Sequence, residues 1–242
     1  MKKIILSLFF IFPLFYSCKS VPLDLKTYSP AAVISVYSNP SVPWYNERTN
    51  SETVDDGILS GAVNRLINKT NPEVETSQER INQAASILYE KLKDSGLEVI
   101  TPQNLENSSV YKNTGKDFFD YIGNTVPAAG YNAITSSNGK LNRMLCKESG
   151  SKSVLYVNFR FQKILAKDGV RNKGVSARLV MTVFATDSNG KKIVSREYKA
   201  VSENYTPFIN TSNWDKEELI SFFPALEEKL ITQFINDYIA YY

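Results

Sequence analysis

The sequence predicts an α/β fold, of the α+β kind, in which helices pack on a mixed sheet of about five strands. Three observations support this prediction. Apolar residues recur at helical spacing in the first half of the chain and near its C-terminal end. Strict alternation of apolar and polar residues fills much of the region 154–201, and turn-forming clusters separate these segments. The predicted order is β-α-α-β, a helical insert, and then β-β-β-α.

The first half of the chain predicts two strands with two helices between them. Residues 31–37 form a compact apolar, β-branched run that is typical of a buried strand. Residues 53–69 and the segment beginning at Thr76 carry apolar residues at helical spacing, and Thr76 with Glu79 has the pattern of a capping box. A glycine then suits the end of the second helix, after which residues 97–100 predict the second strand.

The second half predicts an antiparallel meander after a weaker region. Within residues 103–150 the clearest element is a helix over 141–148, so this region is interpreted as a helical insert. Alternation over 155–162 predicts a strand with one buried face. Strands over 175–186 and 193–201 follow, and the Asn-Gly pair between them is typical of a tight hairpin.

The chain from Trp214 to Tyr242 predicts a C-terminal helix, because its apolar residues form one stripe. Ser212 and Asp215 have the spacing of a capping box at its start. Pro224 cannot donate a backbone hydrogen bond, so it either kinks this helix or starts a new one.

The N-terminus has the build of an export signal. Lys2 and Lys3 precede an apolar run over residues 4–16, which Ser17 and Cys18 follow. As a helix this run is about 20 Å long, whereas the hydrocarbon core of a bilayer is about 30 Å thick. The run therefore fits the core of a signal peptide better than a membrane span.

The segment Leu14-Phe15-Tyr16-Ser17-Cys18 resembles the lipobox of bacterial lipoproteins, in a loose form similar to that of spirochaetes and Bacteroidetes. The resemblance implies that residues 1–17 are a cleaved signal peptide and that Cys18 carries a diacylglyceryl thioether, often with a further acyl chain such as palmitate. It implies a lipid-anchored protein of the cell envelope. Lys19 stands where inner-membrane lipoproteins of enteric bacteria have aspartate, which favours the outer membrane, facing either the periplasm or the surface. An uncleaved anchor and plain secretion are the alternatives.

The rest of the chain predicts one folded unit on a tether. Residues 18–30 contain two prolines and read as a lipidated tether, and 31–242 is long enough for a single α/β domain. The formal net charge of +3 includes Lys2 and Lys3, which leave with the signal peptide, so the mature chain is nearly neutral. This composition favours no nucleic-acid partner.

The residue types present argue against an enzyme. The chain has no histidine, which excludes Ser-His-Asp and Cys-His catalysis and the histidine-bearing zinc sites. With Cys18 lipidated, Cys146 is the remaining cysteine, so no intramolecular disulfide can form. Acidic pairs such as Glu227-Glu228 are sequence neighbours that point about 100° apart on a helix. We therefore expect no catalytic residues, no bound metal and no cofactor.

Trp44 and Tyr45 are the strongest candidates for recognition. They follow a predicted strand in a proline-bounded loop, and both residue types are enriched at binding hot spots. The alternative is that Trp44 folds back onto the core.

The order of elements is similar to that of the periplasmic α/β domain shared by the curli-secretion lipoprotein, the lipoprotein activators of penicillin-binding proteins and the N-terminal domain of TolB. The resemblance favours a module for binding or assembly that docks on another envelope protein, with its own oligomeric state left open. One alternative is a subunit of an oligomeric secretion channel of the curli type, built from an amphipathic hairpin within residues 154–201. The other is a hydrolase that uses acidic residues alone.

Overall fold

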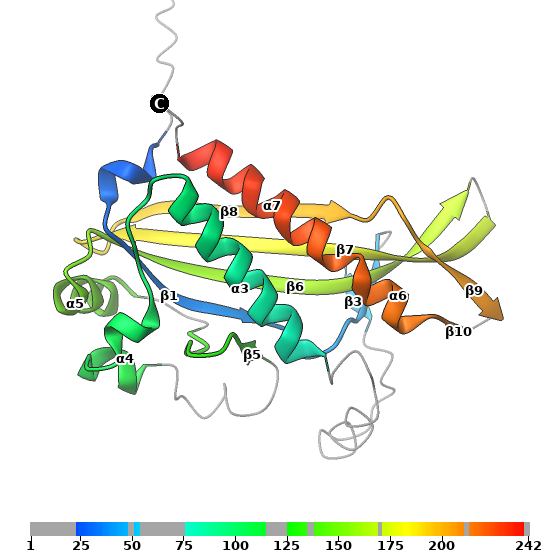
Figure 1. The fold of residues 1–242 in the computed structure, drawn as a ribbon, viewed down its shortest axis with the longest axis horizontal. Coiled ribbons are helices and arrows are strands. Elements are labelled where there is room, and N and C mark those ends of the chain that lie inside the picture. Colours follow the sequence, from blue (N-terminus) through cyan, green and yellow to red (C-terminus); the bar gives the residue numbers. More distant parts are fainter. Residues whose placement is uncertain are drawn as a thin grey trace, which may run out of the picture.

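The computed structural model describes residues 23–47, 51–53, 76–114, 125–134, 138–168, 171–210 and 213–239. A mixed, open sheet with helices packed on it runs through this part of the chain, as Figure 1 shows. The predicted fold class is therefore confirmed. The predicted signal segment with Cys18 lies outside the described residues, as does the predicted helix over 53–69 apart from Thr53.

The centre of the sheet is the predicted meander. β6 (Ser153–Asp168), β7 (Arg171–Asp187) and β8 (Lys192–Val201) pair antiparallel in sequence order. β1 (Ala31–Ser38) runs parallel to β6 on its other side. These strands are the ones whose long apolar or alternating runs were readable in the sequence, since each buries at least one face.

The sheet has more strands than the predicted five. In the described ranges ten strands are connected, because short strands extend the edges of the long ones. The short strands are β2 (Trp44–Asn46), β3 (Ser51–Thr53), β4 (Val99–Ile100), β5 (Val126–Pro127), β9 (Thr206–Asn210) and β10 (Asn213–Trp214). Strands of two to five residues are too short to display a period, and their pairing depends on neighbours that are distant in sequence.

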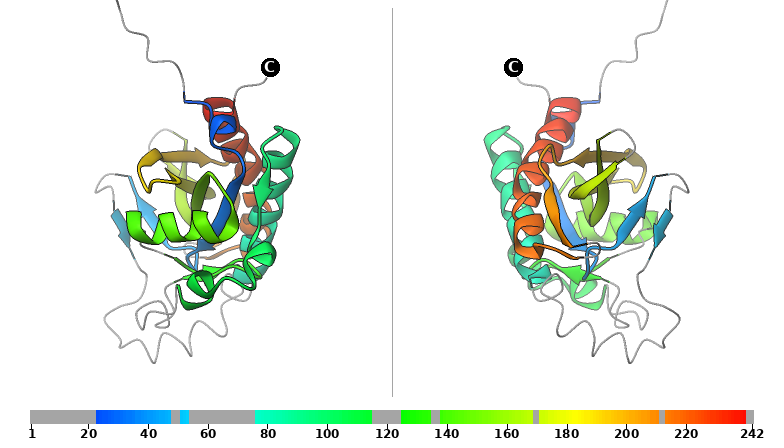
Figure 2. Two further views of the ribbon diagram at one scale, coloured as in Figure 1. Left: turned by 90° about the vertical axis from the view of Figure 1, so that its left-hand side faces the viewer. Right: turned by 90° about the vertical axis from the view of Figure 1, so that its right-hand side faces the viewer.

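Two long helices cover one face of the sheet. α3 (Ser77–Asp94) and α7 (Phe223–Tyr238) lie side by side across it in Figure 1 and enclose the main core with the inward side chains of β6 and β7. α5 (Gly139–Ser149), α4 (Ser109–Asn113) and the 3-10 helix η2 (Pro102–Leu105) pack on the other face around a smaller core. Figure 2 shows α5 on the side of the sheet away from α3 and α7.

Alternate residues of β6 enter the two cores. Leu155 and Val157 belong to the main core, whereas Val154 and Tyr156 belong to the smaller one. The period of two therefore places helices on both faces at this end of the sheet.

Helix ends depart from the prediction in two places. Thr76 is the N-cap residue of α3, but its side chain makes no capping hydrogen bond; its hydroxyl oxygen instead accepts from Arg80 Nη1 at 2.6 Å. Near the C-terminus, Asp215 is itself the N-cap of α6 (Lys216–Ser221) and accepts from Glu218 N at 3.0 Å. Pro224 starts α7 as a new helix rather than kinking a continuous one, because the first turn of a helix does not need its missing N–H.

The folded part of the chain includes residues that we expected in the tether. The 3-10 helix η1 (Leu25–Tyr28) packs against the domain, and Leu25 is fully buried in the main core. At the helix ends, Gly96 and Gly150 adopt the left-handed backbone that the C-terminal caps require. No helix in the described ranges combines the length and apolarity needed to cross a membrane.

Candidate functional site

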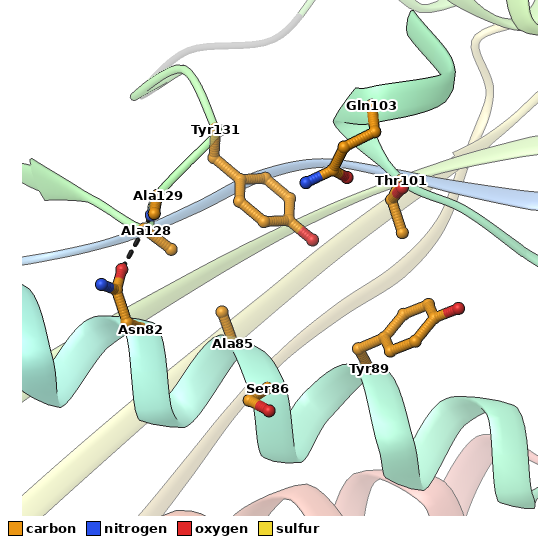
Figure 3. Close-up of a pocket in the computed structure, with 9 residues that line it drawn as sticks. All are labelled: Asn82, Ala85, Ser86, Tyr89, Thr101, Gln103, Ala128, Ala129 and Tyr131. Carbon is orange, nitrogen blue, oxygen red and sulfur yellow. Dashed lines mark hydrogen bonds between the residues drawn. The ribbon is translucent and has the colours of Figure 1, made fainter.

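An open groove of about 520 Å³ lies beside α3 (Figure 3). It is bounded by α3, by the start of η2 and by the segment that follows β5. We call it the α3 groove. Its lining residues are Asn82, Ala85, Ser86, Tyr89, Thr101, Gln103, Ala128, Ala129 and Tyr131.

Helix α3 provides one wall because of its amphipathic pattern. Its buried side, which includes Leu88, packs into the main core. Asn82, Ser86 and Tyr89 are spaced by four and then three residues, so they share another stripe of the helix. Burial of the apolar stripe therefore fixes the direction in which these polar side chains project.

Hydrogen bonds attach the segment after β5 to α3 and to the sheet. Asn82 Oδ1 accepts from Ala129 N at 2.8 Å, as Figure 3 shows, and Gln78 Nε2 donates to Pro127 O at 2.9 Å. Ala128 N donates to Val36 O of β1 at 2.9 Å. Because this wall is bonded to regular elements at both ends, its position is fixed by the fold.

The third wall belongs to η2, where Thr101 is the N-cap and Gln103 reaches toward the groove (Figure 3). Gly130 adopts φ +82°, and a Cβ there would lie 3.3 Å from Gln103 Nε2. Glycine is therefore favoured at this position for two reasons: it adopts the left-handed backbone without strain, and its lack of a side chain lets the two walls approach closely.

A second hollow, of about 460 Å³, has Gly130 and Asn132 in its lining. Its walls include Tyr111, whose hydroxyl donates to Ile34 O at 3.1 Å and accepts from Asn132 N at 3.1 Å. Its other lining residues are Pro102, Glu106, Asn107 and Lys112. Pro102 and Gly130 of this hollow are sequence neighbours of residues that line the α3 groove.

The α3 groove is uncharged and largely apolar. None of its lining side chains is acidic or basic, and the ring of Tyr131 projects into the groove in Figure 3. The side chains of Tyr89, Gln103 and Tyr131 make no hydrogen bond to another described residue. Burial, together with the nearby phenols of Tyr111 and Tyr89, raises the pKa of Tyr131 to about 12. The Tyr131 hydroxyl consequently keeps its proton at neutral pH and can donate to a ligand.

The lining of the groove contains no carboxylate and no thiol. Across the part of the chain that the structure describes, no group of acidic or cysteine side chains is placed to bind a metal ion. Cys146 is buried, and burial raises the pKa of its thiol, which makes it a poor nucleophile.

Trp44 and Tyr45, the predicted recognition residues, lie in β2 rather than in a loop, and neither lines the α3 groove. The ring of Trp44 packs against the main core and meets Trp214 edge-on at 5.3 Å, with Lys163 Nζ 5.4 Å from both rings. The ring of Tyr45 lies 3.7 Å from the guanidinium of Arg178. Both aromatic rings thus make internal contacts.

Sequence reasoning missed the groove because its walls come from three separated segments. Two of these segments lie within residues 103–150 or next to that region, where the spacing of apolar residues shows little periodicity. The available sequence signal would have been Tyr131, an aromatic residue next to the loop-forming segment 126–130.

Because comparison with known proteins assigns no function, the proposal below depends on the residues described above. No protein-family model matches the sequence, and no relative is found among curated proteins.

Proposed function

We propose that the protein is held at the outer membrane by acyl chains on Cys18 and that its α/β domain binds an uncharged segment of another envelope protein. The observation that carries the second half of this proposal is the α3 groove, with its two tyrosines and its uncharged lining. The first half depends on the resemblance of residues 14–18 to a lipobox.

The chemistry of the groove suits an extended peptide. Tyrosine rings supply a large contact area at a low cost in conformational entropy. The carboxamide of Gln103 offers both a donor and an acceptor, which matches a peptide backbone. Because Pro102 and Gly130 of the second hollow are sequence neighbours of residues that line the groove, we expect an extended ligand to run from one hollow to the other.

Binding is also the function that the sheet favours over the alternatives. The inward side chains of β6 and β7 are buried beneath α3 and α7, so these strands are needed for the domain's own core and are poorly suited to a membrane channel. The hydrolase alternative lacks support because the groove holds no carboxylate pair.

Photo-crosslinking in the native envelope tests the peptide site. A photoreactive phenylalanine analogue in place of Ser86, which is exposed at the groove, is expected to give one predominant protein adduct. Adding Tyr131→Ala should lower its yield about tenfold, since a single buried aromatic hot spot contributes about 1–2 kcal/mol.

The same analogue at Met144, an exposed residue of α5, is the control and should not give this adduct. An adduct that persists with Tyr131→Ala would contradict the proposed site. An adduct that is removed by glycosidases would identify a glycan rather than a protein as the ligand.

Cys18→Ala tests the anchor, and we expect the variant to leave the membrane fraction under mild washing. Each buried methylene contributes about 0.8 kcal/mol to membrane binding, and two acyl chains are enough for stable attachment. Cys146→Ala, which removes the other cysteine, is the matched control and should stay in the membrane pellet. Intact-mass analysis that finds an unmodified thiol at position 18 would refute lipidation.

A further inference from the structure

Strand β8 is an open edge of the sheet. Within the part of the chain that is described, β8 pairs only with β7. An open edge carries backbone N–H and C=O groups that another strand can satisfy.

The residues that offer these groups follow from the ladder with β7. Ser202 N donates to Ala177 O at 2.8 Å, in the same register as the β7–β8 pairs. Counting back along β8 from Ser202, every second residue therefore directs its backbone N–H and C=O groups toward β7. The residues between them direct these groups outward. The outward set is Ser195, Glu197, Lys199 and Val201.

The outward set carries one acidic and one basic side chain, Glu197 and Lys199. Glu197 accepts from Lys199 Nζ at 2.8 Å and from Arg160 Nη2 of β6 at 2.8 Å. All three side chains are partly exposed on the sheet face away from α3 and α7. Charges on an edge repel strands that do not match them, so they select among partners rather than merely blocking the edge.

We propose that this edge pairs with β8 of a second copy of the chain, antiparallel across a two-fold axis. In one register, Glu197 of each copy lies opposite Lys199 of the other, and Tyr198 lies opposite its own counterpart on the axis. The outward N–H and C=O groups of Glu197 and Lys199 then bond across the interface, as an antiparallel hydrogen-bonded pair requires.

Neighbouring registers are electrostatically unfavourable. A shift that keeps the same hydrogen-bonding pattern places Glu197 opposite Glu197, or Lys199 opposite Lys199. Like charges directly opposite each other destabilise a pair of strands. On the other face of the proposed register Arg196 lies opposite Ala200, so no like charges meet there. Charge complementarity thus points to a second copy and to one register, independently of the ligand in the α3 groove.

Charge reversal tests this pairing on the full protein in density-matched detergent, with sedimentation equilibrium as the measurement. The wild-type chain is expected to dimerise as its concentration rises. Lys199→Glu and Glu197→Lys alone should each weaken dimerisation about tenfold or more, because two symmetric pairs change from attractive to repulsive. An equal mixture of the two variants should form heterodimers, and the double reversal should dimerise like the wild type.

Arg196→Glu is the matched control, since it changes a charge on the same strand that faces alanine, and it should leave the dimer unchanged. Thermal unfolding of every variant reports folding separately from association. A wild-type chain that stays monomeric would overturn the proposal. Single reversals that dimerise normally, or a mixture that does not restore the dimer, would do so as well.

Discussion

Phe161→Ala is expected to lower the free energy of unfolding by about 3–5 kcal/mol, which is typical of removing a fully buried aromatic ring. Phe161 lies in β6 and has no exposed surface. Its ring meets Phe223 edge-on at 5.0 Å, stacks at 6.5 Å on Phe159, and lies 5.3 Å from the guanidinium of Arg80. Alanine leaves a cavity between the sheet and both long helices. The surrounding side chains hold each other in place, so the cavity does not close.

Denaturant unfolding followed by circular dichroism measures this effect. Leu165→Ala is the control, because Leu165 belongs to the same strand but is 38% exposed. Its substitution should cost less than about 1 kcal/mol. Similar losses for the two variants would show that Phe161 does not lie in a tightly packed core.

Glu227→Gln is expected to stabilise the protein at pH 8 and to have little effect at pH 4. Glu227 lies on α7, is fully buried, and neither of its carboxyl oxygens has a hydrogen-bond partner among the described residues. Burial raises the pKa of this carboxyl to about 8, against an opposing effect of the charge on Arg80 of α3. Glutamine has the shape of the protonated carboxyl but does not titrate.

The sign follows from proton linkage. In the unfolded chain Glu227 ionises near pH 4.5, whereas in the folded chain it stays protonated up to about pH 8. Between these values the folded state binds more protons, so the stability of the wild type falls as pH rises. Its contribution is fully present below pH 4.5 and is lost by about pH 8, where the glutamine variant should be more stable by about 4 kcal/mol.

Denaturant unfolding at several pH values tests this expectation, and the adjacent Glu228 supplies the control. Glu228 is exposed and pairs with Lys91 of α3 at 2.9 Å, which lowers the pKa of its carboxyl. Glu228→Gln should therefore produce no stabilisation at pH 8. If Glu227→Gln instead destabilises the protein at pH 8, the Glu227 carboxylate is ionised and paired with Arg80 in the folded state.

The long elements were predictable because each repeats one pattern over many residues. Helix α3, β8 and α5 lie within a few residues of their predicted positions, whereas β6 extends six residues beyond its predicted end at 162 and β7 begins four residues before its predicted start at 175. The expectation that Glu227 and Glu228 point in different directions also holds, since one is buried and the other is exposed. In each case burial of one face is a local property, which the spacing of apolar residues records.

The candidate site could not be predicted in the same way. Tyr131 and Gln103 were not singled out, because the segments that carry them have little periodicity and are held by backbone and amide hydrogen bonds. Trp44 was singled out for its residue type, yet its ring contacts Trp214 from the far end of the chain. Residue type alone does not distinguish an aromatic ring that binds a ligand from one that packs internally.

The amino-acid sequence by itself determined the α/β class, the alternation along the central strands, the absence of histidine chemistry and the prediction of a lipid anchor at Cys18. The tertiary structure decided which short strands extend the sheet, where an uncharged groove forms beside α3, and which charges meet at the β8 edge. The physical reason is the range of the interactions. Hydrophobic period and residue chemistry act along the chain, whereas edges, grooves and charge pairs exist only once distant segments have been brought together.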